Sequence, residues 1–81
     1  MTSDNLTTYA KQRGIQLHKD DIVFIRALLS PMDRYQRQDY LKRYFEIWRD
    51  AMQSPGMRNA QNAGRHAANT WLREILSKHV L

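Results

Sequence analysis

The chain has 81 residues, no cysteine and a formal net charge of +5 at pH 7, with 13 Lys+Arg against 8 Asp+Glu. A chain of this length forms one domain at most, and the absence of cysteine excludes a stabilising disulfide. The basic balance suits nucleic acid, acidic proteins or anionic surfaces as partners, although it can also serve solubility alone. No apolar run resembles a signal peptide or a membrane span, so we expect a cytoplasmic protein without membrane contact.

The first residues predict a short helix over 3–13. Gly14 offers a left-handed stop for this helix, and Ile15 follows where a hydrophobic contact usually accompanies such a stop. Terminal segments are often only loosely held. We therefore expect a single helical domain over 1–81, to which residues 1–14 are attached more loosely than the rest.

An apolar run that follows two acids, Asp20 and Asp21, predicts a second helix over about 20–29. The acids sit where negative charge favours the positive end of a helix. Apolar side chains surround the axis on nearly all sides, which is typical of a buried helix. A strand through 22–25 is the alternative, because β-branched residues favour strands, but the chain offers no partner strand.

A third helix is expected over about 31–53, with Ser30 as its N-cap and Pro31 at its first helical position. One face carries large apolar side chains, and the opposite face carries charges of both signs that neutralise one another. Tyr44 and Trp48 lie on the apolar face, where we expect core packing. A stacking platform for single-stranded nucleic acid is the alternative role for these aromatic rings.

Pro and Gly at positions 55 and 56 break this helix and predict a final helix over about 57–79. Two long helices joined by a short turn fold back as an antiparallel hairpin. The second arm presents small residues to the aromatics of the first: Ala60, Ala63, Gly64, Ala67 and Ala68. Large side chains opposite small ones let the two backbones approach closely. The sequence thus predicts an all-α fold built on this hairpin.

The hairpin should also gather cations from its open end: Arg34, Arg37, Arg73, Lys78 and His79. Arg34 and Arg37 fall toward the apolar side of their helix, so their stems can lie along the edge of the core with the charged heads in water. Asp33 and Glu74 lie at the same end and are the alternative partners for these cations.

The face of the last helix opposite the small residues carries cations and amides without a carboxylate. This polar strip comprises Arg58, Asn59, Asn62, Arg65, His66, Asn69 and Arg73. Arginine pairs with phosphate, and asparagine contacts phosphates and base edges. Asparagine is a weak helix former, so its recurrence on one face favours a binding role. The candidate nucleic-acid-binding residues are Arg58, Asn62, Arg65, His66, Asn69 and Arg73. The alternatives are a plain solvated surface and a face buried against a protein partner.

The histidines His18, His66 and His79 lack metal-ligand spacing, and no nucleophile–base pattern or phosphate-binding glycine loop appears. We therefore expect no enzyme activity, metal, cofactor or small-molecule substrate. The sequence predicts a small basic accessory or regulatory protein that binds the backbone of DNA or RNA. The alternative is a protein-interaction module, such as an adaptor, an inhibitor or a homodimer, without nucleic-acid contact.

Overall fold

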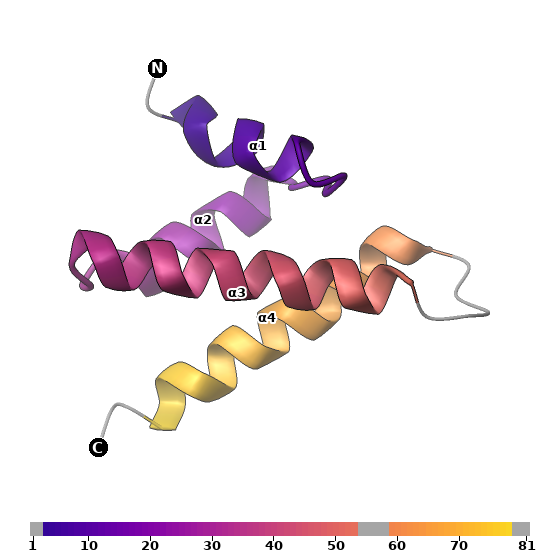
Figure 1. Cartoon of the computed structure of the whole chain (residues 1–81). Coiled ribbons are helices and arrows are strands. Elements are labelled where there is room, and N and C mark those ends of the chain that lie inside the picture. The colour runs from indigo at the N-terminus through magenta and orange to yellow at the C-terminus, as the bar shows by residue number, and fades with distance from the viewer. Residues whose placement is uncertain (1–2, 54–58, 79–81) are drawn as a thin grey trace.

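The computed structural model describes residues 3–53 and 59–78 of the chain. This part contains four helices, labelled in Figure 1: α1 (Ser3–Lys11), α2 (Lys19–Leu29), α3 (Arg34–Met52) and α4 (Ala60–Lys78). No strand occurs among the described residues, so the all-α prediction is confirmed and the apolar run over 22–25 is helical.

The left-handed stop after α1 lies where the sequence predicts it, although the helix itself ends at Lys11, two residues before the expected end at 13. Gly14 has φ +74°, in the left-handed region. The N–H groups of Gly14 and Ile15 donate to the carbonyls of Lys11 and Ala10, each at 3.0 Å, which is the Schellman arrangement of a helix C-terminus. Ala10 and Ile15 are both buried. The stop therefore places residues on both sides of the turn in the core.

The start of α3 lies three residues later than expected, so the assignment of Ser30 as its N-cap is wrong. The N–H of Ser30 donates to the carbonyl of Arg26 at 2.9 Å and closes the end of α2. Asp33 is the N-cap of α3, because its Oδ1 accepts from the N–H of Gln36 at 2.9 Å. Pro31 lies in the turn between the helices, and the Asp side chain satisfies the first turn of α3.

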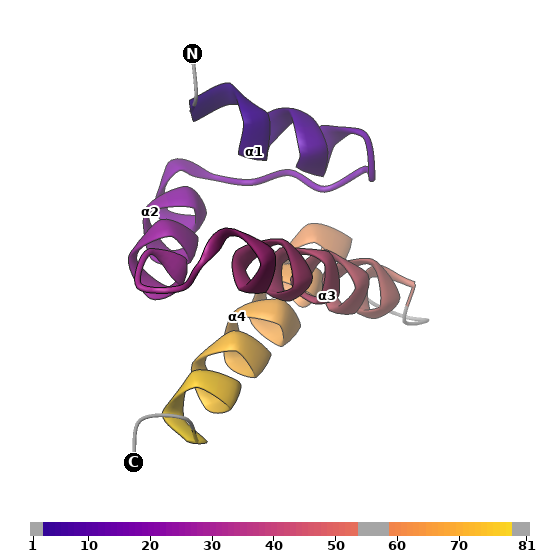
Figure 2. The ribbon, with the colours of Figure 1, turned by 60° about the vertical axis from the view of Figure 1, so that its left-hand side comes forward.

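α2 is less buried than its sequence predicts. Asp21, Ile25 and Leu29 form a buried line at spacings of four residues, whereas Val23 on another side of the helix is 65% exposed. Figure 2 shows α2 beside one end of α3. No other described element covers the outer side of α2, so its all-round apolar pattern does not correspond to all-round burial.

The core combines side chains from all four helices and from residues 14–18, which we call the link. Its fully buried apolar members are Ala10, Ile15, Ile25, Leu29, Tyr44, Phe45, Trp48, Ala68 and Leu72. The Tyr9 and Phe45 rings, with centroids 5.3 Å apart, join α1 to α3. α3 and α4 share the most extensive contact between helices in the described chain.

The contact between α3 and α4 depends on the absence of a side chain at Gly64. A Cβ atom at that position would lie 2.3 Å from Cδ1 of Trp48, which is itself completely buried. The predicted match between the aromatics of one arm and the small residues of the other is confirmed. The buried residues Gly64, Ala68 and Leu72 are spaced by four, a ridge that typically packs at an inclination of about 50°.

The arms of the hairpin consequently diverge. In Figures 1 and 2, α4 runs obliquely away from α3, and the start of α3 and the end of α4 lie well apart. The expected gathering of Arg34 and Arg37 with Arg73 and Lys78 is therefore wrong, and His79 lies outside the described residues. α1 and α2 flank the side of the first half of α3 that carries Arg34 and Arg37, whereas Tyr40 in the same half packs against Trp71 of α4, with ring centroids 6.0 Å apart.

Candidate functional site

The polar strip does not form one exposed surface, because Arg65 at its centre turns into the fold. Its side chain is 17% exposed, and its Nε donates to Oδ2 of Asp21 at 2.8 Å. Its Nη1 donates to Oδ1 of Asn62 at 2.6 Å, and its Nη2 donates to the carbonyl of Gln16 at 3.1 Å. The guanidinium also lies 5.2 Å from the ring centroid of Trp48. Each guanidinium nitrogen of Arg65 thus has a partner within the chain.

The carboxylate that the polar strip lacks in sequence comes from α2. Asp21 is only 4% exposed, and its Oδ2 also accepts from the N–H of His18 at 2.9 Å. One buried carboxylate therefore caps the start of α2 and neutralises Arg65 on α4. The two residues are 44 positions apart, so the periodicity of the last helix gives no sign of the pairing.

The asparagines of the strip also have structural partners. The Tyr44 hydroxyl donates to Oδ1 of Asn69. Burial raises the pKa of the Tyr44 phenol and the Asp21 charge adds to the rise, whereas Arg65 opposes it, so Tyr44 stays a neutral donor at physiological pH. Asn59 accepts from the N–H of residue 62 at 3.0 Å and thereby caps α4. Capping and internal hydrogen bonds account for amides that the sequence associates with nucleic acid.

Gln61 is a residue that the sequence-based prediction missed. Its Nε2 donates to the carbonyl of Gly14 at 2.9 Å, and its Oε1 accepts from the N–H of Gln16 and from Nε1 of Trp48, both at 3.0 Å. Gln61 therefore joins the link to α4 through hydrogen bonds, and it provides the acceptor for the N–H of the buried Trp48 indole. The sequence offered one sign of this role, because Gln61 is a long polar side chain next to Ala60 on a helix face that otherwise consists of small residues.

Three of the candidate residues remain exposed in the described structure: Asn62, His66 and Arg73. Asn62 is engaged with Arg65 through its carbonyl oxygen. The Arg73 guanidinium lies 5.4 Å from the ring centroid of Phe24 on α2. Arg58, the remaining candidate, lies outside the described residues. The strip is thus divided between residues that make hydrogen bonds within the fold, such as Arg65 and Asn69, and residues that face solvent, such as His66 and Arg73.

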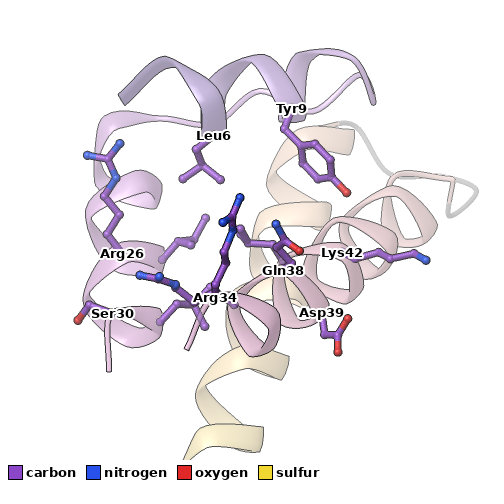
Figure 3. A pocket seen from close by; sticks show the side chains of 12 residues that line it. Leu6, Tyr9, Arg26, Ser30, Arg34, Gln38, Asp39 and Lys42 are labelled. Atoms are coloured by element: carbon purple, nitrogen blue, oxygen red, sulfur yellow. The ribbon is translucent and has the colours of Figure 1, made fainter. Parts of the chain in front are cut away.

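A larger feature lies between α1, α2 and the first half of α3, and we call it the basic groove (Figure 3). Its cavity volume is about 1070 Å³. Its apolar floor consists of the half-buried Leu6, Tyr9 and Leu41, together with Ile25 and Leu29, which belong to the buried core. Its polar rim consists of Arg26, Ser30, Arg34, Arg37, Gln38, Asp39 and Lys42. In Figure 3, Leu6 and Tyr9 extend from α1 toward α3, and Arg26 and Lys42 stand on opposite sides of the opening.

Helical spacing explains how α3 supplies its wall of the groove. Arg34, Arg37, Gln38, Leu41 and Lys42 follow one another at i, i+3, i+4, i+7 and i+8, which places them on one side of the helix. The exposed heads of Arg34 and Arg37 beside the apolar floor agree with the placement expected from the sequence.

The rim of the groove is strongly positive, with four cations and one acid. All four cations are exposed. The ion pairs formed among the described residues are Arg65–Asp21 and Arg43–Glu46, and neither involves a rim residue. Cations of one sign gathered around an apolar surface attract an anionic partner and raise its rate of encounter.

The structure also bears on metal binding and on membrane insertion. Residues 3–53 and 59–78 contain no group of three side chains placed to hold a metal ion. The helices of this part are too short or too polar to cross a lipid bilayer. No protein-family model, curated protein or solved structure matches the chain.

Proposed function

We propose that the chain is a non-catalytic protein-interaction module that binds an acidic segment of a partner protein in the basic groove. The observation that carries this proposal is the apolar floor surrounded by four cations and one acid. The cavity of about 1070 Å³ lies at the upper end of the roughly 300–1,000 Å³ typical of small-molecule sites. The groove is lined by three helices, α1, α2 and α3, which together offer a surface for a segment of a macromolecule.

The composition of the groove favours protein over nucleic acid. Protein interfaces combine a desolvated apolar centre with a polar rim, and the groove has both. Nucleic-acid binding without base readout is dominated by phosphate contacts, which do not use the apolar surface of Leu6, Tyr9 and Leu41. Arg65 lies at the centre of the phosphate-binding face that the sequence predicts, but its guanidinium is paired with the carboxylate of Asp21.

Binding of DNA or RNA is the second candidate function, and the gathering of four exposed cations along the groove favours it. In this case Arg26, Arg34 and Arg37 would contact phosphates in place of Arg65. Such binding must weaken steeply with salt, because each phosphate contact releases condensed counterions. Binding through an apolar floor depends much less on salt.

A titration with three labelled probes distinguishes the candidates. The full chain is mixed with a peptide of leucine and glutamate, a duplex DNA and an RNA hairpin, each at two salt concentrations. The groove variant carries Arg34→Glu and Arg37→Glu. The matched control carries Arg43→Glu and Arg49→Glu, two exposed arginines of the same helix outside the groove. The proposal predicts peptide binding that falls at least about tenfold in the groove variant and is retained in the control.

Other outcomes of this titration have distinct meanings. Binding of the duplex or the hairpin that is lost in the groove variant, with no binding of the peptide, supports the nucleic-acid candidate. Equal losses in the groove variant and the control reduce the interaction to net charge and contradict a role for the groove. A chain that binds none of the probes contradicts both candidates.

A further inference from the structure

We infer that the segment received by the basic groove is an amphipathic α-helix with an apolar stripe and carboxylates on both flanks. This inference rests on the proposed function and names the form of the partner. It follows from three properties of the groove, which are its hydrogen-bonding capacity, its dimensions and the placement of its charges.

The floor of the groove favours a helix over an extended peptide. It is made of apolar side chains from α1, α2 and α3, and helix backbones use their own N–H and C=O groups internally. An extended segment laid on this floor would leave many of its own backbone groups unpaired away from water. A helical segment satisfies these groups within itself and presents only side chains to the half-buried Leu6 and Leu41.

The dimensions of the groove fit about two turns of helix. The wall on α3 runs from Arg34 to Lys42, eight residue steps, or about 12 Å at 1.5 Å per residue. The neighbouring walls are themselves helices, so the partner would pack as one more helix in a groove between them.

The charges specify the flanks of the partner helix. Arg26 on α2 and Lys42 on α3 stand on opposite sides of the opening in Figure 3, with the apolar floor between them. A helix seated on the floor therefore needs acids on both sides of its apolar stripe. A second copy of this chain is a poor occupant, because a formal net charge of +5 on each copy makes the copies repel one another.

The inference is tested with two peptides of identical composition and about 15 residues, a length at which isolated helices are marginal in water. The patterned peptide carries leucine at i, i+3, i+4 and i+7 with glutamate on both flanks. The scrambled peptide has the same residues without a stripe. We expect the full chain to bind the patterned peptide at least about tenfold more tightly, with a gain of helical circular dichroism on binding.

The floor is tested separately from the rim. Leu41→Ala removes a half-buried floor residue of α3, and Ile47→Ala is the matched control, because it is half-buried on the same helix outside the groove. We expect Leu41→Ala to weaken the patterned peptide about tenfold and Ile47→Ala to leave it unchanged. Thermal melts of both variants establish that each is folded at the temperature of the titration.

The outcomes separate this inference from the proposed function. Equal affinity for the patterned and scrambled peptides, both weakened by Arg34→Glu with Arg37→Glu, overturns the helical form and leaves an acidic protein partner in place. Binding of the patterned peptide without a gain of helicity also overturns the helical form. Failure of both peptides to bind overturns the inference and the proposed function together.

Discussion

The two halves of α3 have opposite surroundings. In the second half, Tyr44 and Trp48 are completely buried, and α4 approaches so closely that Gly64 has no room for a side chain. In the first half, Arg34 and Arg37 are exposed beside an open groove. One continuous helix thus contributes a closed half to the core and an open half to a candidate binding surface.

The difference shows that a polar residue makes hydrogen bonds within the fold or remains open to a partner according to which half of α3 it lies near. Around the closed half, Arg65, Gln61 and Asn69 are engaged in internal hydrogen bonds. No buried side-chain nitrogen or oxygen in the described part of the chain lacks a partner. Around the open half, the rim cations take no part in the two ion pairs found among the described residues, Arg65–Asp21 and Arg43–Glu46. Basicity alone does not distinguish an arginine that stabilises the fold from one that is available to a partner.

The largest effect is expected from Arg65→Ala in the closed half. It leaves the buried carboxylate of Asp21 without its cation, which costs about 3–5 kcal/mol. A core of this size supplies only about 3–5 kcal/mol of net stability, so we expect most of the variant to be unfolded at 25 °C. Urea denaturation followed by circular dichroism measures the loss.

Asp21→Asn in the Arg65→Ala background is the control for that experiment, because it removes the uncompensated charge and keeps an acceptor for His18. We expect it to restore part of the stability. An Arg65→Ala variant as stable as the parent would show that this arginine is not part of the fold.

Gly64→Ala should destabilise the closed half by about 1–3 kcal/mol, the usual cost of overpacking a core. The new methyl group would overlap the Trp48 ring, which is too enclosed to move away. Alanine by itself favours a helix over glycine by about 1 kcal/mol, so the sign of the change is informative. A rise in the midpoint of thermal unfolding would contradict the close approach of the two helices.

Tyr44 makes the closed half sensitive to alkaline pH. Its pKa in the folded state is raised by burial above the unfolded value of about 10, so its contribution to stability is complete below pH 10 and is lost as the pH rises further. Tyr44→Phe should cost about 0.5–1.5 kcal/mol at pH 8 through the lost hydrogen bond to Asn69. The variant should lose less stability than the parent between pH 10 and 11. Parallel slopes in denaturation experiments at these pH values would contradict the assignment.

The smallest effect on stability is expected in the open half. Arg34→Glu with Arg37→Glu changes exposed residues outside the ion pairs of the described chain, so the free energy of unfolding should change by no more than about 0.5 kcal/mol per substitution. Urea denaturation checks this value on the same protein samples used for peptide binding. A loss of several kcal/mol would mean that these arginines belong to the fold and would remove the contrast between the two halves.

Features decided by neighbouring residues, or by the periodic faces of two consecutive helices, were predictable. The left-handed stop at Gly14 needs only a local glycine, and the match of Gly64 with Trp48 follows from two complementary helix faces. The pairing of Arg65 with Asp21 was not predictable, because the residues are 44 positions apart and lie on helices that are not consecutive.

The inclination of α4 relative to α3 also could not be predicted from the periodicity of the sequence. It separates the end of α4 from the start of α3, which leaves Arg34 and Arg37 beside α1 and α2. Helical wheels assign faces to single helices, whereas this arrangement depends on how the ridges of two helices interlock. The exposed side of Val23 escaped prediction for a related reason, because burial of α2 depends on the number of elements available to cover it.

The bonds that Gln61 and Arg65 make to the link have a consequence for the order in which the chain can fold. They join Gly14 and Gln16 to residues 45 to 49 positions later. During synthesis on the ribosome, these bonds from the link therefore cannot form until α4 has been made. Closing such long loops is slow compared with forming a helix, so the N-terminal third of the protein should be among the last parts to reach its native arrangement.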